Sequence, residues 1–360
     1  MRESCVGLDI EGNGFFRYPE RVCLVQMSIK DRPYLIDPLQ IDCLLPLKQV
    51  FLDPGTVKIL HAGDYDVRSL DRDFDFQFRN IFDTSIAASF VGSKRLGLDA
   101  VLKEYLGVEV TKSKKLQRSD WTIRPLSKEA QSYAADDVRY LVKARKSLSK
   151  KLKSLGRLEW VAEECERLAS LRFVPRDEDT AFLRVKGCGN LDGKSLAVLK
   201  NLYELREDEA IGRDRPPFKI VSDGVLVTIA ENPKGDHRKI KGIGKWGNSD
   251  MLGRIRSLVE DGLKEDPVVL PKRKSSGRFH LSHSERELAK LRLKKLKQWR
   301  ISIAEDLKVE ASLLWPLISL NRISQTPGSI DQEFEMKEIR RWQVKEFGDD
   351  LRRTVTSLNE

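Results

Sequence analysis

The chain has 360 residues, a formal net charge of +10, 40% hydrophobic residues and 33% charged residues. This length exceeds that of one typical domain, so we expect two or three domains that each bury a core. No apolar stretch reaches the roughly 18 residues of a membrane helix, which excludes a membrane-spanning chain. Asp9 interrupts the short apolar run at the N-terminus, unlike a signal peptide, and we expect a cytoplasmic protein with reduced cysteines.

The N-terminal part of the chain alternates strand-like and helix-like segments. A long helix begins after Pro125, with Ser127 as its N-cap, and continues with a break near Gly156 to about residue 172. The first three strands predict an antiparallel meander, and the alternation that follows predicts an α/β domain with a mixed sheet. Strand patterns cover residues 4–10, 21–29, 33–36, 57–60 and 81–82, and the other helical patterns cover 42–51, 66–74, 83–90 and 97–106.

Two segments interrupt these patterns and predict linkers. Residues 173–180 combine a proline with charged residues, and residues 267–283 contain prolines, a Lys-Arg-Lys run and Ser-Ser-Gly. We therefore expect a first domain at residues 1–172, followed by all-α domains at 181–266 and 284–360.

The two expected all-α domains share a short pattern of one leucine, one arginine and one alanine at equal spacing. Each set places a stripe on one helix face, which arises by chance in many helices and also by internal duplication. The pattern consists of Leu202, Arg206 and Ala210 in one domain, and of Leu296, Arg300 and Ala304 in the other.

Positive charge is concentrated in two segments. Residues 271–300 contain eleven Lys and Arg residues against two glutamates, and residues 139–157 contain eight against no acid. Clustered positive charge is typical of proteins that bind a phosphate backbone, because each neutralised phosphate releases a counterion. A solvated helix face and a charged linker give the same pattern.

Two carboxylates lie on the first predicted strand. Asp9 and Glu11 are two residues apart, so their side chains project from the same face. The rest of the strand is apolar, and unpaired charges are costly to bury in the middle of a sheet. Either a cation compensates the pair, or the pair lies at a solvated end of the strand.

Three further polar residues have access to the same place. Asp66 follows the strand at 57–60, at the end where α/β sheets bind ligands, although alone it is also a candidate helix N-cap. Tyr133 and Asp137 are four residues apart on a predicted helix, so they share one face. This pair either holds a water molecule jointly or is an ordinary surface pair.

Together these residues match a known arrangement. Asp-x-Glu at 9–11, His-Ala-Gly-x-x-Asp at 61–66 and Tyr-x-x-x-Asp at 133–137 resemble the tyrosine-containing branch of the DEDD exonuclease superfamily. Residues 1–172 resemble ribonuclease D throughout, although Ile10 stands where that family commonly has threonine. Residues 181–266 resemble the HRDC helical domain, which helicases share with ribonuclease D. Residues 284–360 resemble a diverged second copy, which favours duplication.

The resemblance implies a ribonuclease H-like α/β nuclease domain with metal-dependent 3′→5′ exoribonuclease activity. It implies that Tyr133 orients the attacking water and that two divalent metal ions are bound by Asp9, Glu11, Asp66 and Asp137. Four carboxylates carry about four negative charges, which two Mg²⁺ or Mn²⁺ ions neutralise, and oxygen ligands suit these hard ions. The expected products are nucleoside 5′-monophosphates.

The resemblance also implies that the substrate is RNA. We expect the helical domains and the basic linker to hold structured RNA, such as a tRNA precursor, while the nuclease receives the single-stranded 3′ tail. No obligate protein partner is evident. Two other classes stay open: a DNA 3′→5′ exonuclease, and a non-catalytic RNA-binding protein with a decayed nuclease domain. The residues expected to guide the RNA backbone, which also fit a solvated loop, are Lys112, Lys114, Lys115 and Arg118.

Overall fold

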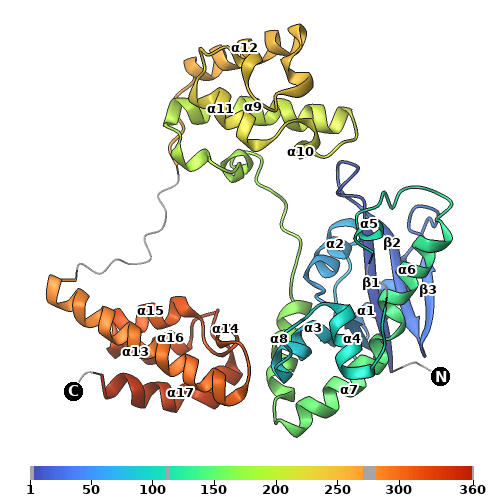
Figure 1. Cartoon of the computed structure of the whole chain (residues 1–360), viewed down its shortest axis with the longest axis vertical. Helices are drawn as coiled ribbons and strands as arrows, with labels where there is room; N and C mark the ends of the chain where they lie inside the picture. The colour runs from blue at the N-terminus through green and yellow to red at the C-terminus, as the bar shows by residue number, and fades with distance from the viewer. Residues whose placement is uncertain (1–3, 111–112, 271–280, 359–360) are drawn as a thin grey trace.

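A five-stranded mixed sheet forms the centre of the N-terminal part of the chain (Figure 1). The structure is a computed structural model and describes residues 4–110, 113–270 and 281–358. The strand order is β3-β2-β1-β4-β5; β1 to β3 are antiparallel neighbours, and β4 runs parallel to both β1 and β5. The predicted meander and mixed sheet are therefore confirmed. The strands are β1 (Cys5–Gly12), β2 (Val22–Ile29), β3 (Arg32–Ile36), β4 (Val57–Leu60) and β5 (Ile81–Asp83).

Residues of β1 alternate between two helical layers. Leu8 and Ile10 enter the main apolar core, on the face covered by α2 (Asp64–Phe74) and α8 (Leu158–Ala169). Asp9 and Glu11 project to the opposite face, where α6 (Lys128–Arg139) packs on the sheet. The two-residue period of a strand thus places both carboxylates beneath α6.

The long helix expected after Pro125 is three separate helices, which corrects the sequence-based prediction. Ser127 is the N-cap, and its hydroxyl accepts a hydrogen bond from the Ala130 N–H at 3.1 Å. An unpredicted break falls at Tyr140, between α6, which packs on β1 to β3, and the next helix, α7, which packs mainly on α3 and α4. No glycine or proline marks that break. The remaining helices of this part are α1 (Leu45–Leu52), α3 (Thr84–Val91), α4 (Leu98–Leu106), α5 (Lys114–Gln117) and α7 (Leu141–Ser154).

Residues 181–266 form a helical unit with its own apolar core, here called the first helical unit. Residues 171–177 lead to it without a helix or strand. Its main helices are α9 (Gly193–Gly212), α10 (Pro217–Ile220), α11 (Asp223–Glu231) and α12 (Ser249–Lys264), and its short 3₁₀ turns are η1 (Ala181–Arg184), η2 (Cys188–Asn190), η3 (His237–Lys239) and η4 (Gly244–Gly247).

Residues 283–357 form the second helical unit, which shares an apolar core with the nuclease. The Trp342 ring stacks on Trp160 of α8, with the ring centroids 4.7 Å apart. Across the three described ranges, no helix is both long and apolar enough to cross a membrane. The elements of this unit are α13 (His283–Leu307), α14 (Ala311–Leu314), α15 (Leu317–Gln325), η5 (Pro327–Ser329), α16 (Ile330–Phe334) and α17 (Arg341–Thr356).

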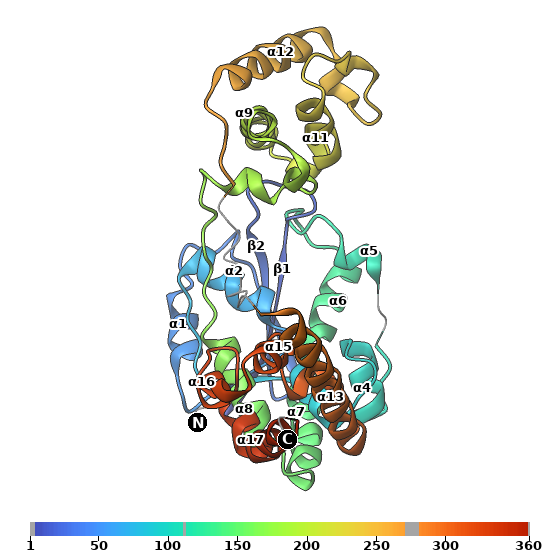
Figure 2. The same ribbon diagram turned by 90° about the vertical axis from the view of Figure 1, so that its left-hand side faces the viewer.

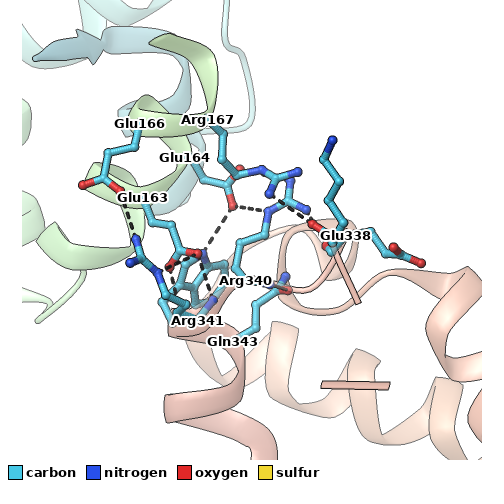
Figure 3. Close-up of polar contacts among 10 residues, drawn as sticks. Glu163, Glu164, Glu166, Arg167, Glu338, Arg340, Arg341 and Gln343 are labelled. Carbon is cyan, nitrogen blue, oxygen red and sulfur yellow. Dashed lines mark hydrogen bonds and ion pairs between the residues drawn. The ribbon is translucent and has the colours of Figure 1, made fainter. Parts of the chain in front are cut away.

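Polar contacts reinforce the packing of α17 on α8, as Figure 3 shows. Glu163 accepts hydrogen bonds from the backbone N–H groups of Arg341 and Trp342 at 2.8 and 3.0 Å. These N–H groups belong to the first turn of α17, where a helix has no internal acceptors for them. Glu164 pairs with the Arg340 guanidinium at 2.8 Å. A carboxylate from the nuclease therefore caps a helix of the second helical unit.

Candidate active site

Three carboxylates meet at the C-terminal end of β1. Asp9 and Glu11 project from β1, and Asp137 comes from α6. An oxygen atom of each lies within 4.8 Å of one from the other two, and all three side chains are half-buried. Carboxylate oxygens gathered in this way form a potential site for a hard cation.

Asp66 lies beside this group without joining it. It is near the start of α2, and its Oδ1 accepts a hydrogen bond from the Ile10 N–H at 3.1 Å. Its carboxyl group also lies close enough to Asp9 for the two groups to shift each other's pKa. The structure thus brings Asp66 into contact with Asp9, and its role as a metal ligand stays a prediction.

Burial and mutual repulsion raise the carboxyl pKa values of the site. Burial, followed by the charges of Asp137 and Asp66, raises the pKa of Glu11 to about 9. Burial also raises the pKa of Asp66 to about 7. The pKa of Asp9 rises well above its ordinary value, through burial first and the neighbouring carboxylates second. A bound cation would remove this repulsion.

Tyr133 and Asp137 lie on one face of α6, as their spacing predicts. The Tyr133 hydroxyl is hydrogen-bonded to Asp137, and burial together with the nearby carboxylates raises the pKa of this hydroxyl. The Tyr133 ring lies 6.2 Å from the ring of Trp121, which is almost fully buried. The ring is therefore held against the core while the hydroxyl points toward the carboxylates.

Asp83 fixes the turn that carries Asp66, and sequence analysis gave it no role. Its side chain is fully buried, and its Oδ2 accepts a hydrogen bond from the Gly63 N–H at 2.8 Å. Its Oδ1 accepts from Ser85 and Ile86 as the N-cap of α3. One carboxylate thus ties the end of β5 to the start of α2. An aspartate at the start of a predicted helix is the signal that points to it.

A cavity of about 860 Å³ opens from the carboxylates and extends to the first helical unit. Among the predicted RNA-guiding residues, Arg118 approaches this cavity, since its guanidinium lies 5.8 Å from the ring centroid of Phe15, a lining residue. Lys114 and Lys115 are exposed on α5 and do not line the cavity. Lys112 lies outside the described residues.

Two family models match the chain. A model described as 3′-5′ exonuclease matches residues 2–153, and one described as HRDC domain matches residues 195–256. The first match contains all four predicted metal ligands and Tyr133. The second lies within the first helical unit.

Curated relatives and solved structures extend the similarity over the whole chain. Ribonuclease D from Desulfotalea psychrophila is 30% identical over 336 residues, which cover 91% of this chain and 86% of that protein. Ribonuclease D from a Shewanella species is 35% identical over 227 residues, covering 62% and 58%. The crystal structure of Escherichia coli RNase D, described as an exoribonuclease involved in structured RNA processing, shares the fold with a TM-score of 0.69. That comparison has 23% identity and covers 99% of this chain and 94% of the other.

Proposed function

The chain belongs to the ribonuclease D family and is a 3′→5′ exoribonuclease, and we propose that it works by two-metal-ion hydrolysis of the last phosphodiester bond. The observation that carries this proposal is the meeting of Asp9, Glu11 and Asp137 in one half-buried place, with Asp66 against Asp9. The products are nucleoside 5′-monophosphates.

The donor set fits Mg²⁺ or Mn²⁺. All the candidate ligands offer carboxylate oxygen, which suits hard divalent cations. Burial first, and neighbouring carboxylates second, raise the pKa values of Asp9, Glu11 and Asp66, and two divalent ions would balance four ionised carboxylates. We therefore assign the metal-binding role to Asp9, Glu11, Asp66 and Asp137.

Different residues of the chain have different roles around the reacting phosphate. Asp9, Glu11, Asp66 and Asp137 would hold the two divalent ions, which when bound would supply activation of a water molecule and stabilisation of the charge on the leaving oxygen. We assign the orientation of that water to the Tyr133 hydroxyl, which lies beside Asp137. A phenol with an ordinary pKa of about 10 keeps its proton at neutral pH, so it positions water by hydrogen bonding. Asp83 and Trp121 are positioning residues for Asp66 and Tyr133.

We further propose that the two helical units are copies of one HRDC-type domain. In the first unit, Arg206 donates to the Val221 carbonyl fifteen residues later, at 3.4 Å. In the second, Arg300 donates to the Trp315 carbonyl, also fifteen residues later, at 2.9 Å. The leucine and alanine that flank each arginine are buried in both units. The repeated spacing thus coincides with a repeated contact, which favours duplication over a chance match.

The proposed substrate is a structured RNA with a single-stranded 3′ tail, such as a tRNA precursor, in the cytoplasm. Lys290, Lys294 and Lys297 are exposed along one face of α13. Exposed lysines at helical spacing present positive charge to a phosphate backbone. The helical units would hold the folded part of the RNA while the tail enters the nuclease.

A digestion experiment tests the proposed function. RNA labelled at its 5′ end is incubated with the protein in Mg²⁺, in Mn²⁺ or in EDTA. We expect shortening from the 3′ end, with the label kept on the long products, and no hydrolysis in EDTA. Asp137→Asn should abolish hydrolysis and leave RNA affinity within about threefold.

Three outcomes would contradict the proposal. Early release of the 5′-labelled nucleotide would mean that degradation runs from the 5′ end. Full activity in EDTA would mean that hydrolysis does not need metal ions. Equal degradation of a matched DNA oligonucleotide would favour the DNA exonuclease instead.

A further inference from the structure

The first helical unit meets the nuclease through polar contacts at the β1–β2 loop (residues 13–21), near α10 in Figure 1. The Arg17 guanidinium pairs with Asp214 at 3.0 Å, and Asp214 also accepts a hydrogen bond from the Tyr18 N–H at 3.1 Å. The Tyr18 hydroxyl donates to Glu207 of α9. Figure 2 shows this unit beyond the ends of β1 and β2. Because the unit keeps a separate apolar core, these contacts set its position over the cavity without fusing the two parts.

The β1–β2 loop is itself anchored to the nuclease. Glu20 accepts a hydrogen bond from the Tyr65 hydroxyl at 2.6 Å and pairs with Arg72 at 3.3 Å. At the other side of the loop, the Asn13 side chain accepts from the Arg21 N–H at 2.7 Å. The base of the loop that carries Phe15 is therefore fixed on the nuclease.

Two exposed aromatic rings line the cavity, one from the nuclease and one from the first helical unit. Phe15 comes from the β1–β2 loop and Phe218 from α10. Phe15 exposes 51% and Phe218 exposes 58% of its surface, so more than half of each side chain is not packed in the core. Exposed aromatic surface inside a cavity is typical of a binding site.

Positive charge lies beside these rings. The Arg118 guanidinium lies over the Phe15 ring, 5.8 Å from its centroid. Arg176 of the connecting segment and Arg184 of the first helical unit line the same cavity. The cavity is thus lined by the carboxylates around Asp9 and, toward the first helical unit, by aromatic rings with Arg176 and Arg184, while Arg206 there is paired with Asp223. Its volume of about 860 Å³ is large for a ligand site, which leaves room beyond the terminal nucleotide.

We propose that Phe15 and Phe218 form a stacking subsite for unpaired bases of the RNA on the 5′ side of the scissile bond, with the arginines beside its phosphates. The inference rests on the proposed function, because it takes the carboxylates as the place of hydrolysis. Aromatic rings stack on the face of any base, so the subsite accepts single strands of any sequence. Paired bases hide those faces within the helix, so degradation stops when a duplex reaches the first helical unit.

Equilibrium binding tests this subsite without any need for catalysis. Fluorescence anisotropy in EDTA gives the Kd of single-stranded RNA for wild type, Phe15→Ala, Phe218→Ala and Phe218→Trp. The control is Tyr34→Ala, because Tyr34 is 48% exposed on β3 and does not line the cavity. A second RNA series carries one abasic nucleotide at each successive position from the 3′ end.

Loss of one stacked base raises Kd by about tenfold, which lies within the range of such contacts. We expect this rise for Phe15→Ala and Phe218→Ala, and near wild-type affinity for Phe218→Trp and Tyr34→Ala. At one position of the RNA, the abasic nucleotide should raise the Kd for the wild-type protein by a similar factor. The same abasic RNA should raise the Kd for Phe218→Ala by less than about twofold, because that variant already lacks the stacking partner.

Two results would overturn the subsite. One is an unchanged Kd for both alanine variants. The other is an abasic penalty as large in Phe218→Ala as in wild type. Failure of the proposed function is a separate result: the wild type would show this coupling in EDTA and still hydrolyse no RNA with Mg²⁺ or Mn²⁺.

Discussion

Glu11 is a site residue whose burial conflicts with its charge. Its pKa is about 9 in the folded protein, against an ordinary value of 4.5. Between these values the folded state binds a proton that the unfolded state has lost, so this contribution to stability falls as the pH rises. We expect the melting temperature in EDTA to fall from about pH 5 to pH 9, and Mg²⁺ to raise it most at the higher pH.

Glu11→Gln is the matched control, because it keeps the size of the side chain and removes its ionisation. Scanning calorimetry in EDTA should show the variant gaining stability relative to wild type as the pH rises. A constant difference between the two proteins across this range would show that Glu11 ionises normally.

Asp83 gives a second prediction at this scale. Asp83→Asn places an amide NH₂ group where the carboxylate accepts from Gly63 or from the first turn of α3. The turn before Asp66 then shifts, and we expect kcat to fall at least about tenfold, as small misplacements of catalytic groups do. Steady-state kinetics on single-stranded RNA measures this effect.

Asp192→Ala is a control for Asp83→Asn, because Asp192 is the N-cap of α9 and accepts from the Ser195 N–H at 2.8 Å. It removes a helix cap away from the carboxylates, so kcat should stay at the wild-type value. Equal losses of kcat in the two variants would mean that capping, rather than the position of Asp66, explains the result.

Local spacing predicted the pairs within one element and could not predict contacts between elements. Asp9 with Glu11, and Tyr133 with Asp137, follow from the periods of a strand and a helix. The hydrogen bond from Ile10 to Asp66 joins residues 56 positions apart, and the role of Asp83 depends on a turn from another strand. Neither contact leaves a periodic signal, so both required the structure.

At the scale of elements, α8 links the nuclease to the second helical unit. Trp160 stacks on Trp342, and Phe90 meets the Trp342 ring edge-on at 5.4 Å. The Arg157 guanidinium donates to the carbonyls of Phe90 and Leu307, each at 2.8 Å. Those carbonyls lie at the C-terminal ends of α3 and α13, where helices lack internal donors for them.

We expect Trp342→Ala to uncouple the second helical unit from the nuclease. Replacing a buried tryptophan with alanine costs about 3–5 kcal/mol, and the loss here falls on a core that the two parts share. Calorimetry should resolve the unfolding of the unit as a transition below that of the nuclease. Lys345→Ala is the control, because Lys345 forms an exposed ion pair with Glu159 in the same interface, and such pairs contribute little. A single unshifted transition in Trp342→Ala would contradict the shared core.

The elements themselves were largely predictable, because hydrophobic periodicity marks each strand and most helices of the nuclease. The break at Tyr140 was not predictable, since Arg139, Tyr140 and Leu141 are all compatible with a helix. The direction of α7 is set by its packing on α3 and α4, which the local sequence does not encode.

At the scale of the whole molecule, the two helical units are attached in different ways. The first keeps its own core and meets the nuclease through polar contacts, whereas the second shares the nuclease core. Sequence patterns predicted two helical domains and could not place them, because the contacts lie between distant segments such as Arg17 and Asp214.

Salt dependence tests the proposed part of α13 in RNA binding. Each phosphate contact adds about 0.7–0.9 to the slope of log K against log salt concentration. We expect the double variant Lys294→Gln, Lys297→Gln to lower the magnitude of this slope by about 1–2 for a tRNA precursor. Lys103→Gln, on α4, is the control and should keep the wild-type slope. An unchanged slope in the double variant would exclude this face of α13 from the contact.

The position of the metal ions is the most direct test of the central claim. Crystals soaked in Mn²⁺ and measured at the manganese absorption edge should show two anomalous peaks about 3.5–4 Å apart. We predict that the peaks lie among Asp9, Glu11, Asp66 and Asp137. Anomalous density elsewhere, with none between these carboxylates, would contradict the two-metal-ion mechanism.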